Sequence, residues 1–106
     1  MMTIKVTREA VCLADDQMEA LELTLEFGAD ATLEDFADRL VRTGFLHFSS
    51  THRTLVGRVS GRSLLRISQR WGTHRVEYLA AADTRLANVA ATIHFGWERR
   101  VTADQP

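Results

Sequence analysis

The apolar residues of segment 30–44 recur every three or four positions, and this pattern constrains the fold more than any other feature of the sequence. The stripe consists of Leu33, Phe36, Ala37, Leu40 and Val41. Such spacing forms one apolar face on a helix of about 3.6 residues per turn. Thr32, with Asp35 three residues later, is typical of a capping box, and Gly44 fits a left-handed stop. We therefore predict a helix over residues 33–43 whose apolar face is covered by another element.

Two alternating segments precede this helix. Residues 21–27 alternate strictly between large apolar and polar side chains, as in a strand buried on one face. Residues 3–7 alternate in the same way, and a later shift of the apolar phase predicts a β-bulge within residues 8–10. We expect the two strands to form a hairpin whose turn lies within residues 14–17, where adjacent aspartates favour a turn.

Short strands are predicted after the helix. Residues 45–53 fit a loop that packs its aromatic side chains beneath the helix, and residues 54–59 fit a strand followed by a Ser-Gly turn. Segment 63–71 fits a further strand with Leu65 and Ile67 inward and the alternate residues outward, although a helix also fits this segment.

The last part of the sequence predicts a turn at residues 72–73 and a strand over residues 75–79. Residues 80–90 fit a short helical turn or a loop. Residues 92–98 alternate again, with Ile93 and two aromatic residues on the inward face. The order of elements therefore predicts one helix that covers one face of a small sheet.

This order resembles the ubiquitin-like β-grasp family, in which a hairpin, a helix, short strands and a final strand beside the first form one domain. The segments that carry the resemblance are residues 3–6, 21–27, 30–41, 55–65 and 91–99. The resemblance implies an α+β fold with a mixed sheet of four to five strands packed on one helix. It places a single domain at residues 1–100 and a tail at residues 101–106. The tail lacks the Gly-Gly pair that conjugating and sulfur-carrier members activate, so we expect no such chemistry here.

Composition and charge exclude several classes of protein. The chain has 106 residues, of which 45% are apolar and 25% charged, as in an ordinary globular domain. Its single cysteine cannot close an internal disulfide, and no segment approaches the run of about 18 apolar residues that spans a membrane. We therefore expect a cytoplasmic protein without a membrane partner.

The charge is divided along the chain. Residues 1–53 hold ten acidic and five basic side chains, whereas residues 54–106 hold four and eight. The formal net charge of −1 argues against nucleic-acid binding, which favours a strong basic excess. We expect the acidic and the basic halves to meet on the same surface.

No catalytic or metal-binding pattern stands out. His47, His52, His74 and His94 show no zinc-site spacing and no HExxH motif, so we predict neither metal nor other cofactor. Cys12 lies in an apolar stretch, where a free cysteine usually behaves as a small hydrophobic residue. The enzymatic alternative is a surface or interface site that uses this cysteine or a pair of histidines.

Arginine occupies every fourth position from residue 58 to residue 70. In an extended segment most of these side chains share the outward face of the sheet, and the planar guanidinium group suits carboxylates on a protein partner. The predicted partner-binding residues are Arg58, Arg66, Arg70, Trp71 and His94. The alternative interpretation, given equal weight, is a solvated sheet face whose arginines pair partly with Glu22 and Glu26.

These features predict a small non-catalytic protein–protein interaction module that binds a protein with an acidic surface. Two uses fit a module of this architecture: an immunity or inhibitor protein bound to a cognate toxin or enzyme, and a ubiquitin-like accessory protein of a secretion system. A small enzyme with a surface or interface site is the third alternative.

Overall fold

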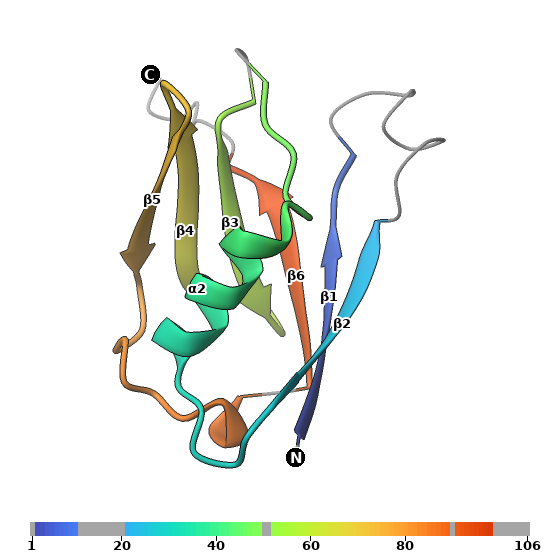
Figure 1. Ribbon diagram of the computed structural model, residues 1–106, viewed down its shortest axis with the longest axis vertical. Coiled ribbons are helices and arrows are strands. Elements are labelled where there is room, and N and C mark those ends of the chain that lie inside the picture. Colours follow the sequence, from blue (N-terminus) through green and yellow to red (C-terminus); the bar gives the residue numbers. More distant parts are fainter. Residues whose placement is uncertain (1, 11–20, 50–51, 90, 99–106) are drawn as a thin grey trace.

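The computed structural model describes residues 2–10, 21–49, 52–89 and 91–98, and Figure 1 shows them as a curled sheet with one helix in its hollow. The strands are β1 (Met2–Arg8), β2 (Glu22–Phe27), β3 (Thr54–Val59), β4 (Arg62–Arg70), β5 (Thr73–Tyr78) and β6 (Thr92–Trp97). Helix α2 spans Leu33–Thr43, and a short 3-10 helix, η1, spans Leu86–Asn88.

The predicted fold class, a sheet of four to five strands packed on one helix, is wrong. The structure has a mixed six-stranded sheet in the order β2-β1-β6-β3-β4-β5, curled into a half-barrel, and only one short α-helix among the described elements. The cause lies in segment 62–78, which forms the long hairpin β4–β5 and extends the sheet at one edge. The twist between neighbouring strands then accumulates into a curl. The helical alternative for residues 63–71 is wrong, because β4 covers residues 62–70 and Trp71 lies in the turn that follows.

The prediction that the final strand lies beside the first is confirmed. Strand β6 runs parallel to β1, with Val6 opposite Ile93, and antiparallel to β3. The two halves of the chain are therefore joined at the centre of the sheet, because β6 lies between the N-terminal hairpin and the β3–β4–β5 meander.

The helix has the predicted bounds. The Asp35 N–H donates to Thr32 Oγ1 over 3.3 Å, and the Thr32 N–H donates to Asp35 Oδ2 over 2.9 Å, which completes the capping box. Gly44 ends the helix with a φ of +74°. Both ends of α2 are thus fixed by residues within the helix and next to it.

The core lies between α2 and the concave face of the sheet. The ring centroid of Phe36 on the helix lies 6.0 Å from that of Phe27 and 6.3 Å from that of Phe95. Gly57 of β3 faces the Phe95 ring. A Cβ at this position would lie 2.8 Å from Phe95 and 2.9 Å from Leu65. The loop after the helix adds to this core as predicted. Leu46 of this loop is buried, and the aromatic residues of the loop pack against the core.

A β-bulge that the sequence did not predict lies between β3 and β4, where the register shifts between Gly57 and Arg58. The β1–β2 register runs without a shift from Met2 to Thr7, and the predicted bulge at residues 8–10 lies beyond these pairs. Leu64 falls at this shift and is buried together with Leu65, although the alternation predicts Leu64 outward. The apolar phase shift beyond residue 10, the predicted turn at residues 14–17 and Cys12 lie outside the described residues.

Candidate functional site

The turn between β4 and β5 carries the most exposed large apolar side chain of the described residues. Trp71 is 92% exposed. Arg70 and Thr73 face each other across the hairpin, so the turn consists of Trp71 and Gly72, one residue earlier than predicted. Their φ angles are +54° and +81°, and positive values at both positions define a type I′ turn.

Tryptophan is an unusual choice for this turn. Only glycine, asparagine and aspartate adopt the left-handed conformation readily, because a Cβ there crowds the following carbonyl oxygen. The β3–β4 turn has the same conformation, with φ of +50° at Ser60 and +82° at Gly61, but a small polar residue occupies its first position. Since the Trp71 indole is almost fully exposed, burial contributes nothing that offsets its backbone strain.

A shallow hollow of about 210 Å³ lies beside this turn. Its lining residues are Ser49, Arg53, Gln69, Arg70, Trp71 and Gly72. The Gln69 N–H donates to the Arg53 carbonyl over 3.1 Å, which fixes the loop before β3 against the end of β4. The hairpin tip, defined here as residues 70–73, is thus an aromatic and cationic projection at one end of the sheet (Figure 1).

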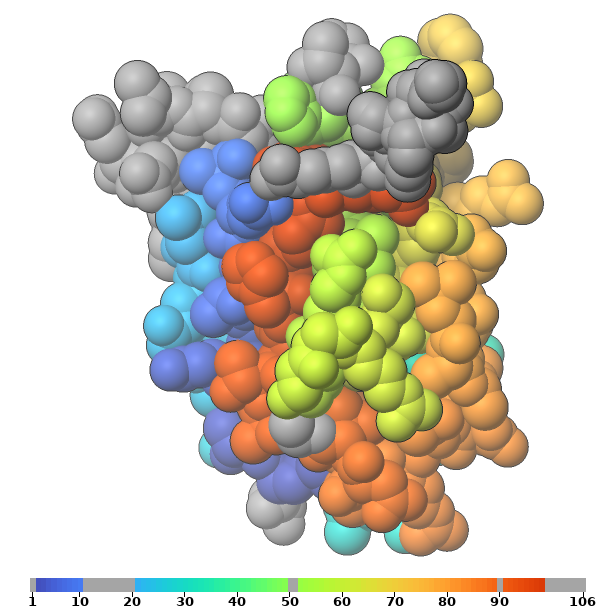
Figure 2. All heavy atoms as spheres, turned by 180° about the vertical axis from the view of Figure 1, so that it is seen from behind, coloured from blue at the N-terminus to red at the C-terminus, as the bar shows by residue number. Residues whose placement is uncertain are grey.

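The predicted row of arginines lies on the convex face of the sheet, away from the helix. Figure 2 shows the molecule from this side. Arg66 lies opposite Val56, and Arg58 lies opposite His94, so the register places these residues on one face. Arg70 follows in the same row but lies at the end of β4, next to the tip. The structure therefore divides the predicted partner-binding residues into a face and a tip.

Arg66 is held by two carboxylates. Its Nη1 donates to Glu77 Oε1 over 2.6 Å, and its Nε donates to Glu98 Oε1. These hydrogen bonds, that to Glu77 first, raise the pKa of the Arg66 guanidinium above its ordinary value. The expected pairing of the arginines with Glu22 and Glu26 is wrong for Arg66, because those glutamates lie on β2 at the far edge of the sheet. Arg66 links β4 to β5 and to the end of β6.

The histidines have different neighbours, although His52 and His74 belong to one aromatic cluster with Phe48 and Trp97. His94 Nδ1 lies 2.7 Å from Thr7 Oγ1 on the convex face, and the His74 ring packs edge-on against Phe48. The His52 ring packs edge-on against Trp97. Over the described ranges of the chain, no three histidine, cysteine or acidic side chains gather in a metal-binding arrangement.

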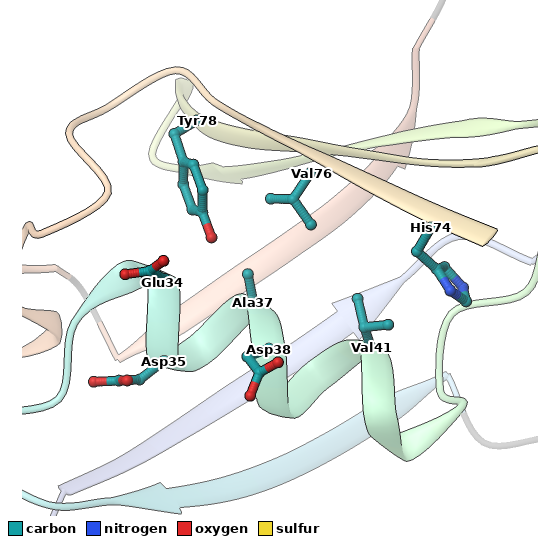
Figure 3. Close-up of a pocket in the computed structure, with 8 residues that line it drawn as sticks. All are labelled: Glu34, Asp35, Ala37, Asp38, Val41, His74, Val76 and Tyr78. Carbon is teal, nitrogen blue, oxygen red and sulfur yellow. The ribbon is translucent and has the colours of Figure 1, made fainter.

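The acidic residues of the helix lie on the opposite side of the sheet from the arginine row. Glu22 of β2 lies on the same face as that row, because strand pairing places it beside Thr7, His94 and Arg58 in turn. The two charged halves therefore meet in part on the convex face, as predicted. A groove of about 460 Å³ separates α2 from β5, with side chains of both elements directed into it (Figure 3). Its lining residues are Glu34, Asp35, Ala37, Asp38, Val41, His74, Val76 and Tyr78. Burial and the charges of Glu34, Asp38 and Asp35 raise the pKa of Tyr78 above its ordinary value.

Sequence reasoning missed this groove. The available signal was the pair Glu34 and Asp38, which are four residues apart and therefore share one side of the helix. The strand beside Glu34 and Asp38 is β5, the second strand of the β4–β5 hairpin. The alternation of apolar and polar residues does not show that this hairpin lies at the edge of the sheet.

Within the part of the chain that the structure describes, no helix is both long and apolar enough to cross a membrane. Comparison with known proteins gives no matching family, no similar curated protein and no similar solved structure.

Proposed function

We propose that this protein is a non-catalytic protein–protein interaction module that binds its partner through the hairpin tip. The observation that carries the proposal is Trp71, a tryptophan that is 92% exposed in a left-handed turn conformation. Strained residues of this kind persist where function favours them, because folding alone selects asparagine or glycine.

The chemistry of the tip suits a protein surface with acidic groups. Tryptophan and arginine are the residues most enriched at binding hot spots, where the aromatic ring fills a pocket and the guanidinium group pairs with a carboxylate. Arg70 adjoins Trp71, and Arg53 lines the same hollow. The net charge of −1 supports a protein partner rather than nucleic acid.

An immunity or inhibitor protein is the specific use that this shape favours. A projecting hairpin fits a concave site on a cognate toxin or enzyme, whereas a flat face does not. We place the interaction in the cytoplasm, which is consistent with a sequence that holds a single cysteine. The ubiquitin-like accessory role in secretion predicts a different class of partner and is distinguished by the identity of the bound protein.

The test is a comparison of two variants in affinity capture from a lysate of the source organism. Trp71→Asn removes the indole and creates the Asn-Gly pair that type I′ turns prefer. Ser60→Asn makes the same change at the β3–β4 turn and serves as the matched control. We expect the wild type and Ser60→Asn to capture the same protein, and Trp71→Asn to lose it by at least about tenfold, as expected for a hot spot. Equal capture by all three proteins would contradict the proposal.

A further inference from the structure

We infer that the outer edge of β5, together with the groove between β5 and α2, binds an extended basic segment of a protein partner as a seventh strand. This surface is distinct from the hairpin tip, and the inference does not depend on the function proposed for Trp71.

The first support is the position of β5. It is the terminal strand of the sheet, and among the described residues its backbone forms hydrogen bonds with the backbone of β4 alone. Arg70 and Thr73 close a two-residue turn and therefore form a hydrogen-bonded pair, so such pairs recur at every second residue along β5. The backbone groups of His74, Val76 and Tyr78 then point away from β4, where an added strand would bond to them.

The second support is the contrast with the other edge. On β2, the Arg39 side chain of the helix donates from Nη1 to the Glu26 carbonyl over 3.1 Å. Its guanidinium carbon also lies 4.6 Å from the centre of the Phe27 ring. A helix side chain therefore covers part of the β2 edge, whereas the groove separates the helix from the β5 edge.

The third support is the chemistry of the groove. Neighbouring strands lie about 4.8 Å apart, so the inward side chains of an added strand would enter the groove beside β5. Ala37, Val41 and Val76 provide apolar contacts there, and Glu34 and Asp38 provide carboxylates (Figure 3).

A lysine or arginine side chain matches this combination, because its aliphatic stem packs on apolar surface while its charged end reaches a carboxylate. Asp38 already pairs with Arg42 over 3.1 Å, but both side chains are largely exposed. Such a surface pair contributes little, so an incoming cation can replace it.

The experiment is an amide NMR titration of the whole protein with a short acetylated peptide that alternates lysine with valine. A peptide with glutamate in place of lysine is the control for charge. We expect the lysine peptide to shift the amide signals of His74, Val76 and Tyr78 most strongly at about 1 mM, since weak complexes are visible at this concentration. The glutamate peptide should leave them unchanged.

Two double variants test the site. Glu34→Gln with Asp38→Asn should weaken binding of the lysine peptide by about fivefold, as expected for two surface ion pairs. Glu22→Gln with Glu26→Gln, which changes the charge equally at the opposite edge, should not weaken it. If the first variant fails to fold, binding of the lysine peptide to the wild type is measured with added salt instead. Salt screens exposed ion pairs and should weaken this binding in the same way.

Several results would overturn the inference: no shift along β5, equal binding of the glutamate peptide, shifts centred on β2, or equal effects of the two double variants. Trp71→Asn should keep the response to the lysine peptide. The two proposals can therefore be contradicted separately, because loss of partner capture by Trp71→Asn concerns the hairpin tip alone.

Discussion

At the scale of single residues, two arginines of the same row have different surroundings. Arg66 lies between two carboxylates and is 32% exposed at its side chain, whereas Arg70 is exposed and lies at the tip. The sequence places both on the outward face through their spacing. It does not show which one finds partners, because Glu77 and Glu98 are far from Arg66 along the chain and reach it only through strand pairing.

We expect Arg66→Met to lower the free energy of unfolding by about 1 kcal/mol, because two partly exposed ion pairs are lost while the apolar stem is kept. Arg70→Met is the matched control and should change it by less than about 0.5 kcal/mol. Urea unfolding followed by circular dichroism measures both values. Equal effects of the two substitutions would show that the carboxylate pairs do not stabilise the sheet.

Tyr78 reports directly on the charge of the groove, because it is the only tyrosine of the chain. Its pKa is raised by burial and by the carboxylates of Glu34, Asp38 and Asp35. We expect the near-ultraviolet phenolate absorbance to titrate above the ordinary value of about 10, and to return toward it in the Glu34→Gln, Asp38→Asn variant. The control with Glu22→Gln and Glu26→Gln should titrate like the wild type, and a common midpoint for all three would contradict the described groove.

The same shift gives a pH dependence of stability. Below about pH 10 the phenol is protonated in both the folded and the unfolded chain, so it adds no pH dependence there. Above that pH the folded state retains the proton more strongly, and the free energy of unfolding falls as the pH rises through the raised pKa of Tyr78. Tyr78→Phe should make this fall smaller.

At the scale of elements, the sequence predicts what is locally encoded. Helix α2 carries its own caps and its own apolar stripe, so its bounds follow from residues next to one another. Strand β3 also has the predicted bounds, because its strand pattern and the Ser-Gly turn that follows it are local features. The burial of Leu64 could not be predicted, because it follows from the register shift opposite Gly57, a relation between strands.

Gly57 leaves no room for a side chain beside Phe95 and Leu65. We expect Gly57→Ala to lower the free energy of unfolding by about 1–3 kcal/mol, since the new methyl group would overlap the Phe95 ring and Leu65. Gly28→Ala is the control, because no heavy atom lies within 4 Å of its added Cβ. Thermal unfolding of the two variants provides the measurement, and an unchanged melting temperature for Gly57→Ala would contradict the packing described here.

At the scale of the whole molecule, the curl of the sheet separates three surfaces. The acidic groove lies on the concave side with the helix, the arginine row lies on the convex side, and the tip projects at one end. The near-neutral total charge hides this separation. Sequence reasoning predicted the arginine row and named Trp71. Its expectation of one surface for both charged halves holds for Glu22 on β2 but not for the acidic residues of the helix, because the sequence does not show which face of the sheet the helix covers.

The central claim is that position 71 holds tryptophan for recognition although the fold favours a smaller residue. The most direct test is the free energy of unfolding of Trp71→Asn beside the wild type, with Ser60→Asn as reference for the same turn conformation. Release of backbone strain, without loss of buried surface, predicts that Trp71→Asn is more stable than the wild type by about 1 kcal/mol. A variant less stable than the wild type would show that the indole contributes to folding, and would contradict the claim.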